Sequence, residues 1–177
     1  MATRRFRAYL TVSLDGYIAD TEGSAEALAP FADSDSGYKA FFDAVDTVVM
    51  GGRTLERMRP RKPWPYTGKR AVVLTRDEPE PLPKAGFEAF AGDVDELATQ
   101  LAAEKGKDIW IAGGARVVEQ FLAAGRLHQL ELLLVPRLLG GGTSLFAANG
   151  PLRPLRLEAN HSFASGVVKL TYVPLPN

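Results

Sequence analysis

One stretch of the chain, residues 108–122, constrains the fold more than any other. An apolar run there stops at Gly113 and Gly114, and the amphipathic segment that follows has an apolar face made by Val117, Val118, Phe121 and Leu122. This pattern predicts a buried strand over 109–112, a tight turn and a helix over 115–124. Free N–H groups and a positive dipole end at the helix start would suit a phosphate or pyrophosphate. Turns of this kind also occur as plain connections, and both interpretations stay open here.

Further short apolar runs alternate with helical patterns. We expect strands over 5–13, 47–50, 71–75 and 130–135. Helices are expected over 38–45, 54–58 and after Asp93, which forms a capping box pattern with Glu96. Two last strands, near 155–162 and 166–173, are joined by a short turn and must be antiparallel. The alternation predicts an α/β fold in three layers, with a mostly parallel mixed sheet, antiparallel C-terminal strands and helices on both faces.

Two connections are interpreted as loops. Residues 20–37 are small and acidic, and residues 59–70 are basic and rich in proline. Candidate N-caps for the helix at 38 are Ser34, Asp35 and Ser36. Four basic residues and two aromatic ones in and just before the second loop suit a solvated lid or a phosphate-bearing substrate better than nucleic acid: Arg57, Arg59, Arg61, Lys62, Trp64 and Tyr66.

Composition excludes several function classes. The 177 residues suffice for one domain over 1–177, and 21 basic residues balance 21 acidic ones, so charge favours neither nucleic acid nor an acidic membrane. Without cysteine, disulfides and zinc–thiolate sites are excluded. His128 and His161 lie far apart without neighbouring carboxylate spacing, so we expect no metal. No secretory signal or membrane-length apolar stretch is found, and we expect a cytoplasmic protein.

Three predicted strands end in clusters of small residues, hydroxyls and arginines. Ligands of open α/β sheets gather at the carboxyl ends of strands, and guanidinium groups bind phosphate in bidentate fashion. Three such clusters at equivalent places indicate a ligand with several phosphates. The alternative is that the arginines simply lie in water at strand ends. The clusters are Gly51, Gly52, Arg53 and Thr54; Leu74, Thr75 and Arg76; and Gly113, Gly114, Ala115 and Arg116.

The common nucleotide and hydrolase motifs are absent. No G-x-G-x-x-G follows a strand, no G-K-[ST] Walker loop is present, and no G-x-S-x-G elbow appears.

The chain resembles a known family at these same segments. Residues 49–54, 72–76 and 111–117 resemble, in order, the three cofactor-binding segments of dihydrofolate reductase. Residues 12–19 and 135–140 are more similar to the reductase domain of the bacterial riboflavin-pathway deaminase–reductase. The resemblance spans nearly the whole chain. It implies a dihydrofolate-reductase-like fold, NADPH as cofactor and hydride transfer from its nicotinamide.

The resemblance also implies residue roles. Arg53 and Thr54 would contact the phosphates of the cofactor, while Thr75 and Arg76 would surround the adenosine 2′-phosphate. The pyrophosphate would lie at the third segment. The cofactor-binding set is thus Gly51, Gly52, Arg53, Thr54, Leu74, Thr75, Arg76, Ala112, Gly113, Gly114, Ala115, Arg116 and Val117.

Catalytic candidates are fewer. Asp35, or Asp33, lies near the place of the folate-binding carboxylate, where it would help protonate a ring; its alternative role is that of an N-cap. Asp15 would face the nicotinamide, or would only form an Asp-Gly turn. Thr143 corresponds to a threonine near the substrate of dihydrofolate reductases.

Two departures from the family pattern affect specificity. Gly52 replaces an arginine of dihydrofolate reductases, and Met58-Arg59-Pro60 replaces the acidic pair before proline in riboflavin-pathway reductases. The first departure weakens the expected NADP preference, and the second counts against the same substrate. From the resemblance as a whole we expect an NADPH-dependent reductase of a heterocycle, with the riboflavin-pathway pyrimidine as first candidate and dihydrofolate as second. A protein that binds a nucleotide without turnover is the rival from another class. The family resemblance also implies a homodimer.

Overall fold

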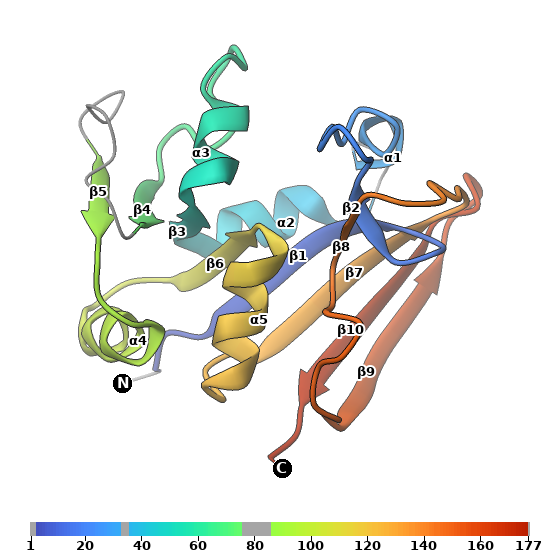
Figure 1. The fold of residues 1–177 in the computed structure, drawn as a ribbon. Helices are drawn as coiled ribbons and strands as arrows, with labels where there is room; N and C mark the ends of the chain where they lie inside the picture. The colour runs from blue at the N-terminus through green and yellow to red at the C-terminus, as the bar shows by residue number, and fades with distance from the viewer. Residues whose placement is uncertain (1–2, 33–35, 76–85, 177) are drawn as a thin grey trace.

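The computed structural model describes residues 3–32, 36–75 and 86–176, which form one eight-stranded sheet and a small two-stranded one (Figure 1). The order in the large sheet is β5-β4-β3-β6-β1-β7-β10-β9. Neighbours from β5 to β7 run parallel, and β10 is antiparallel to both β7 and β9. Its strands are β1 (Phe6–Ser13), β3 (Val45–Gly51), β4 (Arg70–Leu74), β5 (Phe87–Phe90), β6 (Asp108–Gly113), β7 (Gln129–Val135), β9 (Leu155–Ser162) and β10 (Val168–Pro174).

Helices cover both faces of this sheet, as predicted. On one face, α4 (Val94–Ala103) and α5 (Ala115–Ala123) bury apolar stripes against β1, β3, β6 and β7. On the other, α2 (Tyr38–Ala44) and α3 (Gly52–Met58) pack Phe41 and Leu55 against Val48 and Trp110, with α1 (Ala29–Ala32) nearby. Strand β7 is buried on both sides, which explains its almost wholly apolar sequence. No helix in the described part of the chain has the length and apolar character needed to span a membrane.

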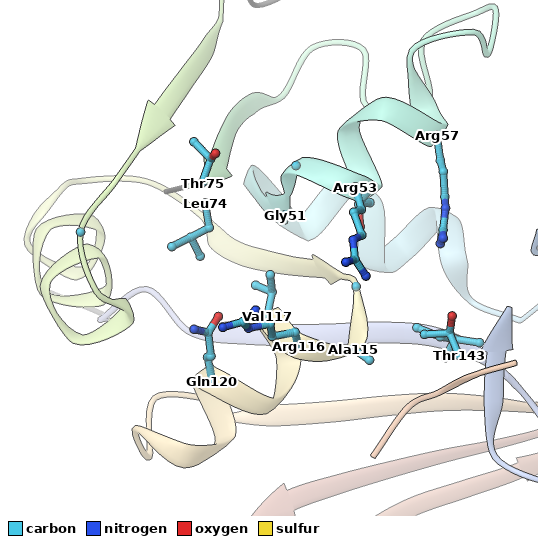
Figure 2. Close-up of a pocket in the computed structure, with 15 residues that line it drawn as sticks. Gly51, Arg53, Arg57, Leu74, Thr75, Ala115, Arg116, Val117, Gln120 and Thr143 are labelled. Carbon is cyan, nitrogen blue, oxygen red and sulfur yellow. The ribbon is translucent and has the colours of Figure 1, made fainter. Parts of the chain in front are cut away.

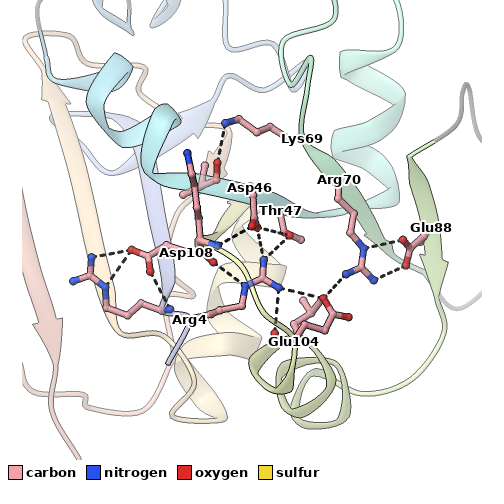
Figure 3. Close-up of polar contacts among 12 residues, drawn as sticks. Arg4, Asp46, Thr47, Lys69, Arg70, Glu88, Glu104 and Asp108 are labelled. Atoms are coloured by element: carbon pink, nitrogen blue, oxygen red, sulfur yellow. Dashed lines mark hydrogen bonds and ion pairs between the residues drawn. The ribbon is translucent and has the colours of Figure 1, made fainter. Parts of the chain in front are cut away.

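Charged residues pair along the edge formed by the amino ends of the parallel strands (Figure 3). The buried guanidinium of Arg4 pairs with Asp46 and with Glu104, and it donates to the Thr47 hydroxyl over 2.7 Å. Arg70 binds Glu88 through two nitrogens, each at 2.7 Å, and reaches Glu104 at 2.6 Å. The arginines of this network therefore have carboxylate partners within the protein.

The structure corrects two expectations around the segment 20–37. The segment 20–37 contains the short helix α1, because Leu28 is buried and begins a turn. The N-cap of α2 is Gly37, without a side-chain hydrogen bond, so an N-cap at Ser34, Asp35 or Ser36 was wrong. Ser36 instead accepts a hydrogen bond from the Tyr9 hydroxyl at 2.9 Å.

The other local corrections concern short strands and the basic loop. Strands β2 (Tyr17–Ala19), β5 and β8 (Thr143–Ser144) were not predicted. Trp64 and Tyr66 belong to an aromatic cluster in the core rather than to a solvated lid. The helix over 94–103 begins as predicted, since the Asp93 carboxylate accepts from the backbone N–H of Glu96 at 2.8 Å.

Candidate cofactor site

A cavity of about 450 Å³ opens at the carboxyl ends of β3, β4 and β6 (Figure 2). The register places the three predicted clusters together there, because Gly51 lies opposite Leu74 and Met50 lies opposite Gly113. The volume is within the usual range for small-molecule sites. The residues that line it are Ile18, Gly51, Gly52, Arg53, Thr54, Arg57, Leu74, Thr75, Gly92, Gly114, Ala115, Arg116, Val117, Gln120 and Thr143.

Glycines bring the walls of this cavity close to one another. A Cβ atom added at Gly51 would lie 3.2 Å from Cγ2 of Val117, which is tighter than ordinary packing. Gly113 has φ +106°, a conformation that side chains disfavour, and its peptide bond to Gly114 is cis. At Gly114 an added Cβ would lie 3.6 Å from the Thr54 hydroxyl, so this glycine faces α3 across the cavity. The glycines thus leave space where a ligand approaches the backbone.

The start of α5 lines the middle of the cavity, between the end near Thr75 and the end near Thr143 (Figure 2). Gly114 is the N-cap and has no side chain to accept a hydrogen bond from the first turn. The N–H groups of Ala115 and Arg116 are therefore left for an external acceptor, beside the positive end of the helix dipole, while the N–H of Val117 donates to the Gly114 carbonyl at 3.0 Å. The apolar stripe of Val118 and Phe121 is fully buried and holds the helix against the sheet. An anion here would meet a rigid set of donors.

The charged side chains that line the cavity are all positive among the described residues. Arg53, Arg57 and Arg116 line it, and none of the described lining residues is acidic. No carboxylate in the described part of the chain lies within ion-pair distance of these three guanidinium groups. This contrasts with the opposite edge of the sheet, where Arg4 and Arg70 are paired. Uncompensated guanidinium groups around a cleft favour a polyanionic ligand.

Ten of the thirteen residues predicted to bind a cofactor line this cavity. Ala112 and Gly113 belong to β6 directly beneath it but are not among the lining residues, and Arg76 lies outside the described residues. Lining residues that the sequence reasoning missed include Gln120, which lies four positions after Arg116 and so on the same side of α5. Ile18 and Gly92 were also missed, because tertiary contacts between segments distant in sequence bring them here. Arg57, one turn after Arg53 on α3, was predicted only as part of the basic group that suits a solvated lid or a phosphate-bearing substrate.

The two carboxylate candidates lie elsewhere. Asp35 is outside the described residues. Asp15 is exposed and is not among the residues lining the cavity; its carboxylate accepts hydrogen bonds from the Ser13 hydroxyl at 2.6 Å and from the N–H groups of Leu139 and Gly140. The Ser13 bond, followed by the backbone bonds, lowers the pKa of Asp15 to about 2. This geometry ties the β1–β2 turn to the loop after β7, while a catalytic role of Asp15 stays a prediction.

Thr143 lines the cavity from strand β8. The residue before this strand, Gly142, approaches β2 closely: an added Cβ would collide with the carbonyl oxygen of Ala19, and φ is +126°. Only glycine is compatible with this approach. Gly142 therefore places Thr143 at the cavity, and substrate binding by Thr143 stays a prediction.

Comparison with known proteins decides the family. The model of the RibD C-terminal domain matches residues 6–169. The chain belongs to this family. Its curated relatives include YwjB of Bacillus subtilis (strain 168), which is 35% identical over 178 residues that cover 96% of this chain and 98% of YwjB.

Solved structures share the fold of this chain. A Shewanella sp. PV-4 protein named for riboflavin biosynthesis superposes with a TM-score of 0.84 at 26% identity, covering 97% of this chain and 99% of that one. The deaminase/5-amino-6-(5-phosphoribosylamino)uracil reductase of Thermotoga maritima gives 0.72 at 15% identity, with 98% of this chain and 57% of that one covered. Dihydrofolate reductase of Enterococcus faecalis, complexed with NADP(H), gives 0.69 at 17% identity and 96% coverage of both chains. The predicted dihydrofolate-reductase-like fold is confirmed.

Proposed function

We propose that this RibD C-terminal domain protein is an NADPH-dependent reductase that transfers hydride to a C=N or C=C bond of a small heterocycle. The observation that carries the proposal is the cavity where three strand ends meet, which is lined by three arginines and by no described acidic residue. The family supports a reductase related to riboflavin biosynthesis. We further propose that it acts in the cytoplasm.

The residues present fit the coenzyme. The start of α5, with Gly114, Ala115 and Arg116, would hold the pyrophosphate, and Arg53 with Thr54 would face it from α3. Thr75, at the far end of the cavity, would lie beside the adenosine 2′-phosphate together with Arg76, which follows it in sequence. When bound, NADPH supplies the hydride, and the protein supplies position and positive charge.

For the substrate, we propose 5-amino-6-(5-phosphoribosylamino)uracil or a close relative, with dihydrofolate as the second candidate. The name of the Thermotoga maritima neighbour and the family match support the first. Thr143 would contact the substrate, and Asp35 or Asp15 would be the acidic group. The absence of a carboxylate among the described lining residues favours a second candidate function, nucleotide binding without turnover.

Calorimetry with each coenzyme, followed by an assay of NADPH consumption with a pyrimidine or pterin acceptor, tests the proposal. We expect NADPH to bind and to be consumed with one of these acceptors. Binding without consumption would leave only the non-catalytic candidate, and failure to bind either nicotinamide coenzyme would refute both. Arg76→Ala should weaken NADPH more than NADH; an equal loss would exclude Arg76 from 2′-phosphate recognition.

We also propose a homodimer. The edge strand β9 is exposed at all eight positions and carries Leu155 and Leu157, and unprotected edges of this kind are ready to associate. Sedimentation of the purified chain tests this, and a monomer would refute it.

A further inference from the structure

Arg57 lies at one end of the cavity, away from the part that fits the coenzyme phosphates. Figure 2 shows Thr75 and Gln120 at one end, Arg53, Ala115 and Arg116 between, and Arg57 with Thr143 at the other. Arg57 is in the last turn of α3, and its side chain is exposed. In the described part of the chain it forms no ion pair.

The guanidinium of Arg57 is held by the loop after β2. It packs against Gly23, where an added Cβ would overlap Nη2 and lie 3.0 Å from Cζ. Asp20, in the same loop, directs its carboxylate to the backbone N–H groups of Glu22, at 3.0 Å, and Ser24, at 2.8 Å. The Asp20 carboxylate is therefore used within the loop, and neither Glu22 nor Glu26 forms an ion pair with Arg57 among the described residues, so the positive charge of Arg57 stays uncompensated.

The coenzyme has no anion for this end of the cavity. Its negative charges belong to the pyrophosphate and the 2′-phosphate, and its reduced nicotinamide ring is neutral. If the pyrophosphate lies at α5 and the 2′-phosphate near Thr75, the nicotinamide lies toward Thr143, where Arg57 faces it. A guanidinium at that place would be positioned to pair with an oxyanion of a second ligand.

We propose that Arg57 is a specificity-determining residue that binds an oxyanion, phosphate or carboxylate, on the hydride acceptor. This inference rests on the proposed function, because it takes the orientation of the coenzyme from it. Gly23 contributes by leaving space for the guanidinium and so keeping it directed into the cavity. Acceptors that lack an anionic group would then bind poorly.

The test uses the intact protein saturated with NADP⁺, so that the phosphate positions of the coenzyme are filled. Inorganic phosphate, and separately acetate, are titrated while the arginine side-chain N–H signals are followed by NMR. The variants are Arg57→Gln, Arg57→Lys and, as a matched control, Arg156→Gln, an exposed arginine on the distant strand β9. Phosphate and acetate distinguish between the two kinds of oxyanion.

We expect phosphate or acetate to bind wild type and Arg156→Gln equally. Arg57→Gln should weaken this binding about tenfold or more, with partial recovery in Arg57→Lys, while the affinity for NADP⁺ stays within about twofold. Anion binding that does not respond to Arg57→Gln overturns the assignment, as does an equal loss of NADP⁺ affinity, which would make Arg57 a coenzyme residue. If wild type does not bind NADP⁺, the proposed function fails first and this inference fails with it.

Discussion

A negative charge introduced at Ala115 should abolish most coenzyme binding without harming the fold. Ala115 is the first residue of α5, is half-buried and lines the cavity where the pyrophosphate is proposed to lie. The helix lacks acidic residues in its first turn, so Ala115→Asp would complement its dipole and add up to about 1 kcal/mol of stability. The same carboxylate would oppose the bound pyrophosphate.

The size of this effect follows from Coulomb's law. Two like charges about 4–6 Å apart, at an effective dielectric constant of about 20, repel by roughly 3–4 kcal/mol, and each 1.4 kcal/mol is tenfold in affinity. The open side of the cavity adds screening, so we expect NADPH affinity to fall by about 100-fold. Ala115→Asn has the same shape without the charge and serves as the matched control.

Calorimetric titration of NADPH into the three proteins, at low and at high salt, measures the difference between Asp and Asn. The gap should narrow at high salt because the repulsion is screened. Thermal melting of the coenzyme-free proteins should show Ala115→Asp at least as stable as Ala115→Asn. Equal affinity of the two variants for NADPH would refute the placement of the pyrophosphate at α5.

Three further expectations concern the frame around the site. Gly142→Ala should lower the free energy of unfolding by about 1–3 kcal/mol in denaturant titrations, since its Cβ meets the backbone of β2 at positive φ, whereas Gly141→Ala, with room for its Cβ, should be nearly neutral; equal effects would contradict this. Because hydrogen bonds lower the pKa of Asp15 to about 2, its ionised carboxyl stabilises the fold above the unfolded-state pKa and stops doing so as pH falls through about 2. The melting temperature of Asp15→Ala should therefore lie below that of wild type at neutral pH, with the gap closing near pH 2; a constant gap would show that the carboxyl has no such role. In the same denaturant titrations, Arg4→Ala should lower the free energy of unfolding by about 3 kcal/mol, because it removes the buried cation of the network. The side chain of Arg5 is half-exposed, so Arg5→Ala should lower the free energy of unfolding by less than about 1 kcal/mol. Similar losses in the two variants would argue against a stabilising role of the network.

Long, regular elements were predictable, and short ones were not. The apolar stripe of α5, with Val118 and Phe121, and the unbroken apolar run of β7 carry a period that local sequence displays. Strands β2, β5 and β8 have two to four residues, and backbone pairing with distant partners creates them. The N-cap of α2 was predicted wrongly for a related reason, because the hydroxyl of Ser36, in the loop before the helix, accepts a hydrogen bond from Tyr9 of the distant strand β1.

The residues of the candidate site also fall into those that the sequence predicted and those that it did not. Clusters at three strand ends were visible because each combines glycine or hydroxyl residues with arginine within four positions. Arg57 and Gln120 were not singled out as cofactor-site residues, since nothing in their immediate sequence distinguishes them from solvated residues of a helix. The sequence also did not show which arginines form ion pairs, because Arg4 and Arg5 lie 100 and 103 residues from their partners Glu104 and Asp108.

The amino-acid sequence by itself determined the layered α/β fold, the clusters of glycine, hydroxyl and arginine residues at the strand ends and the family resemblance, because these depend on local periodicity and on residue types that lie next to each other. Only the tertiary structure decided that β6 lies between β3 and β1, which brings Gly51 against Val117 and joins the three clusters in one cavity. It also decided which arginines are paired and which face the cavity. Pairing across a sheet depends on the order and register of strands, and contacts between distant segments establish both.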